Sequence, residues 1–524
     1  MKTMKKMFGI VISMLAAISL VGCSSNNQDA SKKDEKATVN IAISSESNAQ
    51  KLDATSYDAD MALYGAVYEP LVEYGEKGAF KPGLAESWEI SEDGKKYVFH
   101  LKKDVKFSDG SDVNAEAVKF TIDRAKAKNE TSALQTLTNL EKIEVIDDTT
   151  VAMHFTKISN QVLAELCQTR PLRIMSPHSV EGEKVDGAFK EAIGTGAFTV
   201  KEISAEQVLM EPNPYYNHGN PVNYQVNFKT IEDGSSRTLA LKSGEVDVVG
   251  GTLGSITDSD INSLRKDKSY NVHKFEGTVS HFLAFNPDNQ VLTSTIRKGI
   301  ELAVNKSTLS DKKLVGLFWE NVKYVSTDNQ ENIPYDLNKA RSMFESEGYV
   351  ENAEGYYEKA NNVLAFDLVI QTTEFPEWKE QAEIIESDLK KAGVKVNINI
   401  FDSESYYDVL WNKKKYDMIF YRTFTDALLP YNFLNSLYHN TAEGHGVLAN
   451  DEKLTNLLDD FAVTIQEKKQ QQIFDNIFKR ISEETLAIPI DYKDEKFVTS
   501  SKISEFHYSG LSDAPIDFKK LVVK

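Results

Sequence analysis

The alternation of apolar and polar positions is most regular between residues 364 and 421. In the predicted helix at 376–391, Ala382, Ile385 and Leu389 fall on one face, and Gly393 follows as a stop signal. Strand-like and helical runs alternate through the whole stretch, which predicts strands at 364–370, 394–400 and 416–421 and helices at 376–391 and 403–411. This order is typical of a parallel sheet built through right-handed crossovers.

A second block of the same kind lies earlier in the chain. Residues 235–241 have helical spacing, and Gly244 and a strand at 246–249 follow. Turn signals around 92–94 and 108–110 separate alternating runs and indicate an extra β-rich region. Single cores rarely grow beyond roughly 250–300 residues. The 524-residue chain is therefore expected to form an α/β protein with two lobes around a cleft.

The first 23 residues predict export. Three lysines precede an apolar stretch at 7–20 that is too short to span a bilayer. Residues Leu20–Cys23 then resemble a lipobox, the site where bacterial lipoproteins are cleaved and acylated. An uncleaved signal anchor with a chance cysteine is the alternative. The first interpretation makes 1–22 a lipoprotein signal peptide and places lipidated Cys23 at the outer face of the cytoplasmic membrane, in the periplasm or at the cell surface.

Composition narrows the possible partners. Residues 24–36 are polar and contain no aromatic residue, so 23–37 is expected to be a flexible tether. The net charge is −19, and removing residues 1–22 takes away three lysines and no acid, leaving −22. Such an excess argues against binding nucleic acid. Cys23 and Cys167 are the only cysteines, so no disulfide is expected once Cys23 carries lipid.

Catalytic signatures are missing from the sequence. It has no HExxH, CxxC, GxSxG or GxxxxGK[ST] pattern. Gly194 and Gly196 lack the further glycine of a dinucleotide site. The prediction is that the protein is not an enzyme, with an exported hydrolase as the alternative.

Arginine is more informative, because only nine occur among 60 basic residues. Lysine supplies the general surface charge, so arginine is expected where its planar fork recognises carboxylate or phosphate. Arg170 and Arg173 flank Pro171, which stiffens the backbone between them. Arg422 stands at the carboxyl end of a predicted strand, where ligands of parallel sheets bind. Each is a candidate anion clamp or a structural partner of one of the many acids.

Histidines and aromatic residues offer further candidates. His439 and His445 lie in a loop-like stretch that could close over a metal, or they are solvated loop residues. His281 either faces the cleft or packs beside its strand. Most aromatic residues in a protein lie in the core. The candidates for a ligand-facing wall are Tyr57, Tyr64, Tyr421 and Phe424.

An ordered series of motifs supports a family resemblance. It comprises Val67–Val72, Pro82–Trp88, Ser91–Lys95, Val105–Gly110, Ile193–Phe198, Ala303–Lys306 and Ile488–Ile490. From about residue 38 to the C-terminus the chain resembles the family 5 extracellular solute-binding proteins of ABC importers. The resemblance implies a periplasmic-binding-protein-like fold. It implies lobe I at 38–275 and 491–524, with a subdomain at about 75–190, and lobe II at 276–490.

Within that family the chain is most similar to the nickel- and metallophore-binding branch. Arg170 to Arg173 resemble an R-P-x-R motif whose first arginine holds chelator carboxylates, and Tyr57 resembles a cleft tyrosine. Residues 417–424 resemble a strand that ends in R-T-aromatic. Leu428 replaces a cleft tyrosine, and the loop histidine of that branch falls near Ala442.

The implied function is transport of a nickel or other transition-metal chelate, with no intrinsic cofactor. The expected partners are an ABC permease and its ATPase, the membrane through the lipid anchor, and no nucleic acid. The protein is expected to be a monomer. A peptide-binding protein and a sensor subunit are the alternatives.

Overall fold

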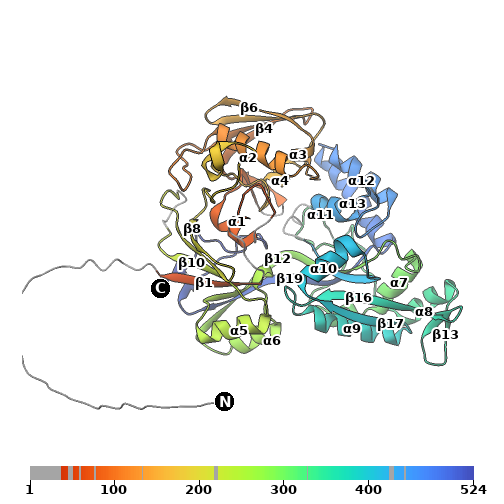
Figure 1. Ribbon diagram of the computed structural model, residues 1–524. Coiled ribbons are helices and arrows are strands. Elements are labelled where there is room, and N and C mark those ends of the chain that lie inside the picture. The colour runs from red at the N-terminus through yellow and green to blue at the C-terminus, as the bar shows by residue number, and fades with distance from the viewer. Residues whose placement is uncertain are drawn as a thin grey trace, which may run out of the picture. The chain divides into compact units, whose positions relative to one another are not determined.

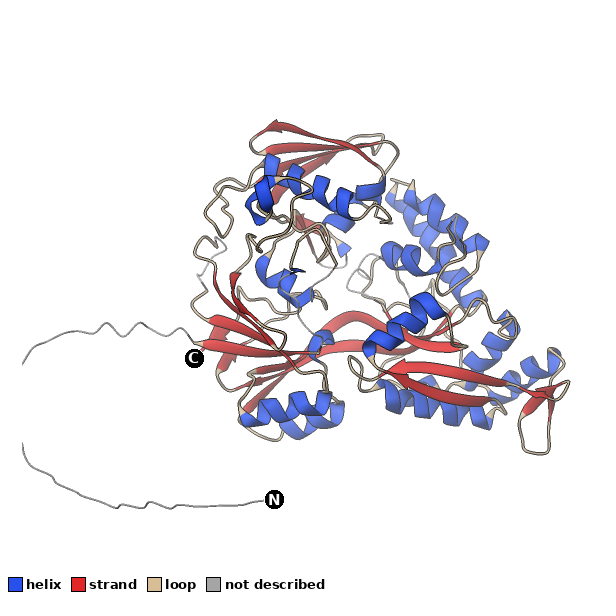
Figure 2. Cartoon of the chain, viewed as in Figure 1, coloured by secondary structure: helices blue, strands red, loops and turns tan. Residues whose placement is uncertain are grey.

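The computed structural model describes residues 37–44, 51–57, 61–75, 78–132, 134–216, 222–326, 328–423, 430–441 and 444–524. The predicted signal peptide, Cys23 and most of the tether lie outside these ranges. The part from Ala37 to Lys524 is one compact unit of mixed α/β structure (Figures 1 and 2). Within the described residues, no helix combines the length and the apolar character that crossing a membrane would need.

A ten-stranded sheet forms the framework. Its order is β17 (Lys395–Phe401), β16 (Ala365–Gln371), β18 (Met418–Arg422), β12 (Tyr270–Phe285), β19 (Ala487–Ser500), β11 (Val248–Gly250), β1 (Thr38–Ile43), β10 (Gln225–Thr230), β9 (Gln207–Pro212) and β8 (Phe198–Ile203). β16 is parallel to β17 and β18, and β1 is parallel to β10 and β11. Both predicted α/β blocks are therefore confirmed.

The predicted helices of these blocks also form. α9 spans Trp378–Lys391, and α10 (Ser403–Asp408) continues into a π-helical turn at Val409–Lys413. α5 (Gly234–Ser243) begins where Asp233 accepts a hydrogen bond from the Ser236 backbone. It ends at Gly244, whose φ of +78° is readily adopted only by glycine.

Strands β12 and β19 are unusually long, with 16 and 14 residues. One end of this antiparallel pair contacts β18, and the other end contacts β11. Their register shifts between Glu276 and Ser280, and again between His281 and Phe282. Two strands thus connect the two parts of the sheet, and the irregular pairing lies at the middle of that connection (Figure 2).

The extra β-rich region is an antiparallel four-stranded sheet with its own core. Its order is β4 (Ala85–Ile90), β5 (Lys96–Leu101), β7 (Thr150–Phe155) and β6 (Leu140–Asp147), and it packs with α2 (Ala115–Lys128), α3 (Gln135–Thr138) and α4 (Val162–Leu166). Gly94 and Gly110, in the two predicted turns, have φ values of +63° and +86°. The turn chemistry therefore predicted both positions correctly.

The remaining strands and α-helices complete the described chain. The strands are β2 (Val72–Tyr74), β3 (Phe80–Pro82), β13 (Val350–Glu351), β14 (Tyr357–Lys359), β15 (Asn362–Val363), β20 (Ile503–Glu505) and β21 (Val522–Val523). The helices are α1 (Met61–Val67), α6 (Asp258–Leu264), α7 (Ser294–Ala303), α8 (Leu337–Ser346), α11 (Pro430–Tyr438), α12 (Glu452–Ala462) and α13 (Glu467–Glu483).

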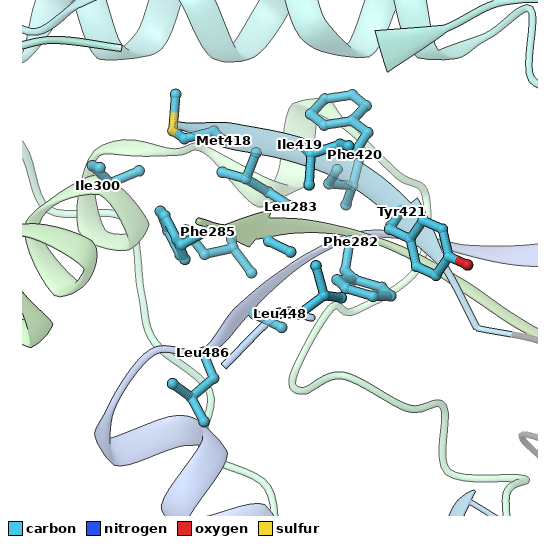
Figure 3. Close-up of a cluster of buried hydrophobic side chains, with 14 of the residues drawn as sticks. Phe282, Leu283, Phe285, Ile300, Met418, Ile419, Phe420, Tyr421, Leu448 and Leu486 are labelled. Carbon is cyan, nitrogen blue, oxygen red and sulfur yellow. The ribbon is translucent and has the colours of Figure 1, made fainter. Parts of the chain in front are cut away.

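The hydrophobic clusters divide along the chain. All buried members of one cluster lie within residues 282–490, and Figure 3 shows part of it, including Phe282, Leu283 and Phe420. Three other clusters draw theirs from residues 39–264 and 497–521. Separate cores joined by two long strands are what the two-lobed fold requires.

Glu165 on α4 is a charged residue inside the subdomain core. It is 1% exposed, and its carboxylate oxygens accept hydrogen bonds from the backbone N–H groups of Gln135 (2.8 Å) and Thr136 (2.6 Å) at the start of α3. Burial nevertheless raises the pKa of Glu165 from 4.5 to about 7, because desolvation outweighs those bonds.

This pKa predicts a pH dependence of stability. Folded protein holds the Glu165 proton more tightly than unfolded protein does, so this contribution is complete below about pH 4.5 and is lost as pH rises through about 7. In urea unfolding, Glu165→Gln is expected to remove up to about 3 kcal/mol of the stability change between pH 5 and pH 8. Glu141→Gln, at an exposed position on β6, is the matched control. Identical pH profiles for the wild type and Glu165→Gln would contradict the assignment.

Candidate ligand-binding site

Arg170 and Tyr57, 113 residues apart in sequence, lie in contact. The Arg170 guanidinium donates from Nη1 to the Tyr57 carbonyl oxygen at 2.5 Å. Its central carbon lies 5.5 Å from the centre of the Tyr57 ring, a cation–π contact. Arg170 is half-buried and Tyr57 is 47% exposed. The pair presents a fixed positive charge and an aromatic surface to solvent, which suits an anionic ligand with planar groups.

The segment that carries Tyr57 is fixed by an ion-pair network around the buried carboxylate of Asp53. Asp53, 2% exposed, accepts hydrogen bonds from Arg124 Nη2 (2.7 Å) and Lys128 Nζ (2.8 Å) of α2. The Tyr68 hydroxyl donates to the Leu52 carbonyl oxygen at 2.8 Å. Burial alone would raise the pKa of Asp53, but the bonds from Arg124 and Lys128 lower it to about 2. These bonds anchor the segment before Tyr57 to α2 and to Tyr68.

Arg173 has different surroundings from Arg170. It is 5% exposed, and it donates to the carbonyl oxygens of Gln168 (2.9 Å, from Nε) and Tyr68 (3.4 Å, from Nη1). Burial lowers its pKa, and the negative charge of Glu73 partly offsets that. Arg173 thus ties the Arg170 loop to the core, and its direct contact with a ligand stays a prediction.

Arg422 and His281 form a second group. They are register partners on β18 and β12, and both contact the Phe375 ring, at 5.6 Å and 5.1 Å from its centre. Trp378 Nε1 donates to His281 Nδ1 at 2.9 Å. The pKa of His281 lies well below 6.5 because of burial, helped by the charges of Lys493 and Arg422. His281 is therefore neutral, with its proton on Nε2.

Arg422 is 5% exposed and lies among acidic and phenolic groups. Burial would lower its pKa, but Tyr407, Asp513 and Glu374 together raise it. Glu374 accepts hydrogen bonds from Ser403 (2.6 Å) and Tyr407 (3.1 Å). Asp513 lies in the C-terminal segment, whereas Arg422 lies in the part of the chain that forms the cluster of residues 282–490. Their attraction therefore acts between the two parts of the fold. No local motif marks Glu374 or Asp513, so neither could be singled out from the sequence.

Tyr421 lies inside the core. It is 2% exposed and packs edge-to-face against Phe282 at 6.0 Å between ring centres (Figure 3). Tyr421 therefore occupies a core position, and its role as a ligand-facing wall stays a prediction. Phe424, Leu428 and Ala442 lie outside the described residues.

The structure places His439 and His445 with different partners. His439 Nε2 lies 3.0 Å from Asp459 Oδ1. His445 Nε2 lies 2.8 Å from Asp288 Oδ1, and its Nδ1 lies 2.7 Å from the Gly446 carbonyl oxygen. Within the described part of the chain, no group of three or more His, Cys, Asp or Glu residues could hold a metal. Metal ligation by these histidines would require them to leave their present partners, and it stays a prediction.

A charged pocket lies beside the long strands, and its lining includes residues that no sequence motif marks. Lys493 Nζ pairs with Glu377 at 2.8 Å. Glu495 is 2% exposed, accepts hydrogen bonds from the Thr252 backbone (3.1 Å) and hydroxyl (2.9 Å), and has a pKa raised by burial. The sequence feature that could have pointed to these pocket residues is the charged run at 491–496, which interrupts an otherwise apolar strand.

Comparison with known proteins places these features in context. The chain is 27% identical over 469 residues to the nickel-binding periplasmic protein of Escherichia coli K12, covering 86% of this chain and 88% of that protein. It is 27% identical over 389 residues to the dipeptide-binding protein of E. coli K12, covering 67% and 69%. The crystal structure of NikA from Brucella suis in complex with Fe(III)-EDTA superposes with a TM-score of 0.84 at 27% identity, covering 93% of this chain and all of that one.

The family comparison agrees with the fold and with the resemblance found in the sequence. The matching model is described as bacterial extracellular solute-binding proteins, family 5 Middle, and it covers residues 79–445. Two-lobed proteins of this kind are also the structural neighbours. Because the match extends over more than half of its residues, this chain belongs to the family 5 bacterial extracellular solute-binding proteins.

Proposed function

We propose that this chain is the lipid-anchored substrate-binding protein of an ABC importer and that its cargo is a carboxylate-bearing chelate of a transition metal, with nickel as the first candidate. The observation that carries the proposal is the contact between Arg170 and Tyr57, in which a guanidinium lies over a half-exposed ring. An arginine fork binds carboxylates in bidentate fashion, and an adjacent ring covers the flat part of a chelator. Relatives named as nickel-binding or bound to Fe(III)-EDTA support this ligand class.

Capture would proceed by closure of two lobes. Lobe I would comprise residues 38–275 and 491–524, with the subdomain at about 75–190, and lobe II residues 276–490. The division of the hydrophobic clusters supports these bounds, and the irregular pairing of β12 and β19 suits a hinge. A ligand that contacts both lobes favours the closed form, which a permease would then recognise. The protein would act as a monomer and release its ligand chemically unchanged.

The proposed anchor is the acylated thiol of Cys23 after removal of residues 1–22. One acyl chain gives only marginal membrane binding, so the multiple chains of a lipoprotein would be needed for stable attachment. Cys23→Ser is expected to move the protein from the membrane fraction to the soluble fraction of its host. Unchanged membrane association of Cys23→Ser would remove the lipid from the proposal and leave the ligand assignment untouched.

Metal-resolved native mass spectrometry tests the cargo. Protein purified from a medium that contains both metals and peptides is expected to carry a transition metal together with a small carboxylate-rich molecule. A ladder of short peptides without metal would overturn the chelate assignment and favour peptide transport, for which the dipeptide-binding relative is the precedent. A ligand that returns chemically altered would instead indicate a hydrolase.

A further inference from the structure

Side-chain amides of the subdomain bind the end of α12, far from the long strands β12 and β19. Asn160 Nδ2, in the loop before α4, donates to the carbonyl oxygens of Phe461 (2.5 Å) and Thr464 (2.8 Å). Gln135 Nε2 of α3 donates to the carbonyl oxygen of Ala462 at 3.4 Å. We call this group of five residues the amide clasp. Figure 1 shows α3 and α12 facing each other on the side of the fold away from β12 and β19.

The acceptors of the clasp suit a reversible contact. The last carbonyl groups of a helix have no partner within the helix. Phe461 and Ala462 end α12, and Thr464 lies two residues beyond it. The Phe461 oxygen also accepts from the Thr464 backbone N–H (3.0 Å), and the Thr464 oxygen also accepts from Gln470 Nε2 (2.8 Å), so these two carbonyls keep a partner when the subdomain amides leave. Exchanging water for an amide changes the free energy only modestly. The clasp can therefore form and break without unfolding either partner.

The donors of the clasp are held in place on the subdomain side. The Asn160 Oδ1 atom accepts a hydrogen bond from Gln161 Nε2 at 3.0 Å, which fixes the amide so that Nδ2 faces α12. Gln135 begins α3, whose first N–H groups bind the buried carboxylate of Glu165. Both donors are thus positioned by contacts within the subdomain, before any contact with α12 is made.

Apolar contacts surround these hydrogen bonds. Tyr431 of α11 stacks on Phe461 with 5.2 Å between ring centres. A Cβ on Gly94 would lie 2.8 Å from Cδ1 of Ile465, so the Gly94 turn and the loop after α12 are in direct contact. Asn160 and Gln135 belong to the subdomain, whereas Tyr431 and Phe461 belong to the cluster of residues 282–490.

We propose that the amide clasp is the closing contact of the ligand cleft, with Asn160 as the residue that holds the lobes together opposite the hinge. This inference rests on the proposed function insofar as it assumes a cleft between the two lobes. A contact placed far from the hinge separates most when the lobes rotate apart, so its hydrogen bonds are broken in the open form and their net free energy favours the closed form alone. When the clasp stabilises the closed form, less of the ligand's binding free energy is needed to close the lobes.

Spin-label distances between the lobes test the clasp without any ligand. Labels on Glu92→Cys and Lys469→Cys, both exposed, report the separation of the subdomain and α13, and Cys167 is buried and stays unlabelled. Asn160→Asp keeps the acceptor for Gln161 but turns a carboxylate oxygen toward two carbonyls. The measured distance is expected to increase by several ångströms in Asn160→Asp. An unchanged distance distribution would overturn the proposal.

A matched control and a binding measurement complete the test. Asn412→Ala removes an exposed amide that binds Asp408 four residues away, and it is expected to leave the distance unchanged. With Fe(III)-EDTA as the probe, Asn160→Asp is expected to weaken binding roughly tenfold. If wild-type protein does not bind the probe, the chelate proposal loses support, while the ligand-free distances still decide for or against the clasp. Circular dichroism melting of Asn160→Ala, a second variant that removes the Asn160 amide and its two hydrogen bonds to the α12 end, shows whether a loss reflects unfolding.

Discussion

Replacing Arg170 with alanine is expected to weaken chelate binding by roughly 2–5 kcal/mol, at least about a 30-fold rise in Kd, while the protein stays folded. The reason is that a carboxylate enclosed by lobe closure would lose its charged partner. Arg170 is half-buried and binds the Tyr57 carbonyl oxygen at the surface, so its loss leaves the cores intact. Isothermal titration with Fe(III)-EDTA measures the affinity, and thermal melting measures the fold.

Two further variants sharpen the Arg170 test. Arg170→Lys keeps the charge but not the planar fork, so it is expected to recover only part of the affinity. Arg265→Ala removes an exposed arginine that binds Asn262 on its own helix, and it serves as the matched control. Equal affinity for wild type and Arg170→Ala would remove Arg170 from the site and with it the main support for an anionic cargo.

Much of the fold could be predicted because local patterns determine it. Strands β16, β17 and β18 belong to a parallel block whose apolar runs are separated by a helix of clear periodicity. The stop after α5 was visible because a left-handed residue was needed at Gly244. The pair Glu276 and Ser280, by contrast, gave no local sign that pairing changes register there. Irregularities of this kind depend on the partner strand, which lies about 200 residues away in β19.

The candidate site was predictable only in part. Arg170 and Arg173 were singled out by composition and spacing, yet spacing does not tell which side chain faces solvent. The structure separates them: Arg170 lies beside the exposed Tyr57, and Arg173 is buried among carbonyl groups. The electrostatic interaction of Asp513 with Arg422 joins segments about 90 residues apart. A single sequence carries no signal for such long-range electrostatic pairing when acids are abundant.

Replacing Asp53 with alanine is expected to destabilise the protein by about 3–5 kcal/mol, because it leaves the buried guanidinium of Arg124 without its carboxylate. Asp53 and Arg124 are each 2% exposed, and a charge in such a place has no water to replace the lost partner. The midpoint of urea unfolding measures the loss. Chelate affinity is also expected to fall in Asp53→Ala, since the segment that carries Tyr57 loses its anchor.

The acid dependence of this effect distinguishes the ion pair from a simple packing defect. The pKa of Asp53 is about 2 in the folded protein and near 3.8 when unfolded, so its contribution is complete above about pH 4 and is lost as pH falls toward 2. The stability difference between wild type and Asp53→Ala should therefore narrow over that range. Asp123→Ala, which breaks a more exposed pair with Lys119 on the same helix, is expected to change stability by at most about 1 kcal/mol. If Asp53→Ala were no more harmful than Asp123→Ala, the buried network would not be what holds Tyr57 in place.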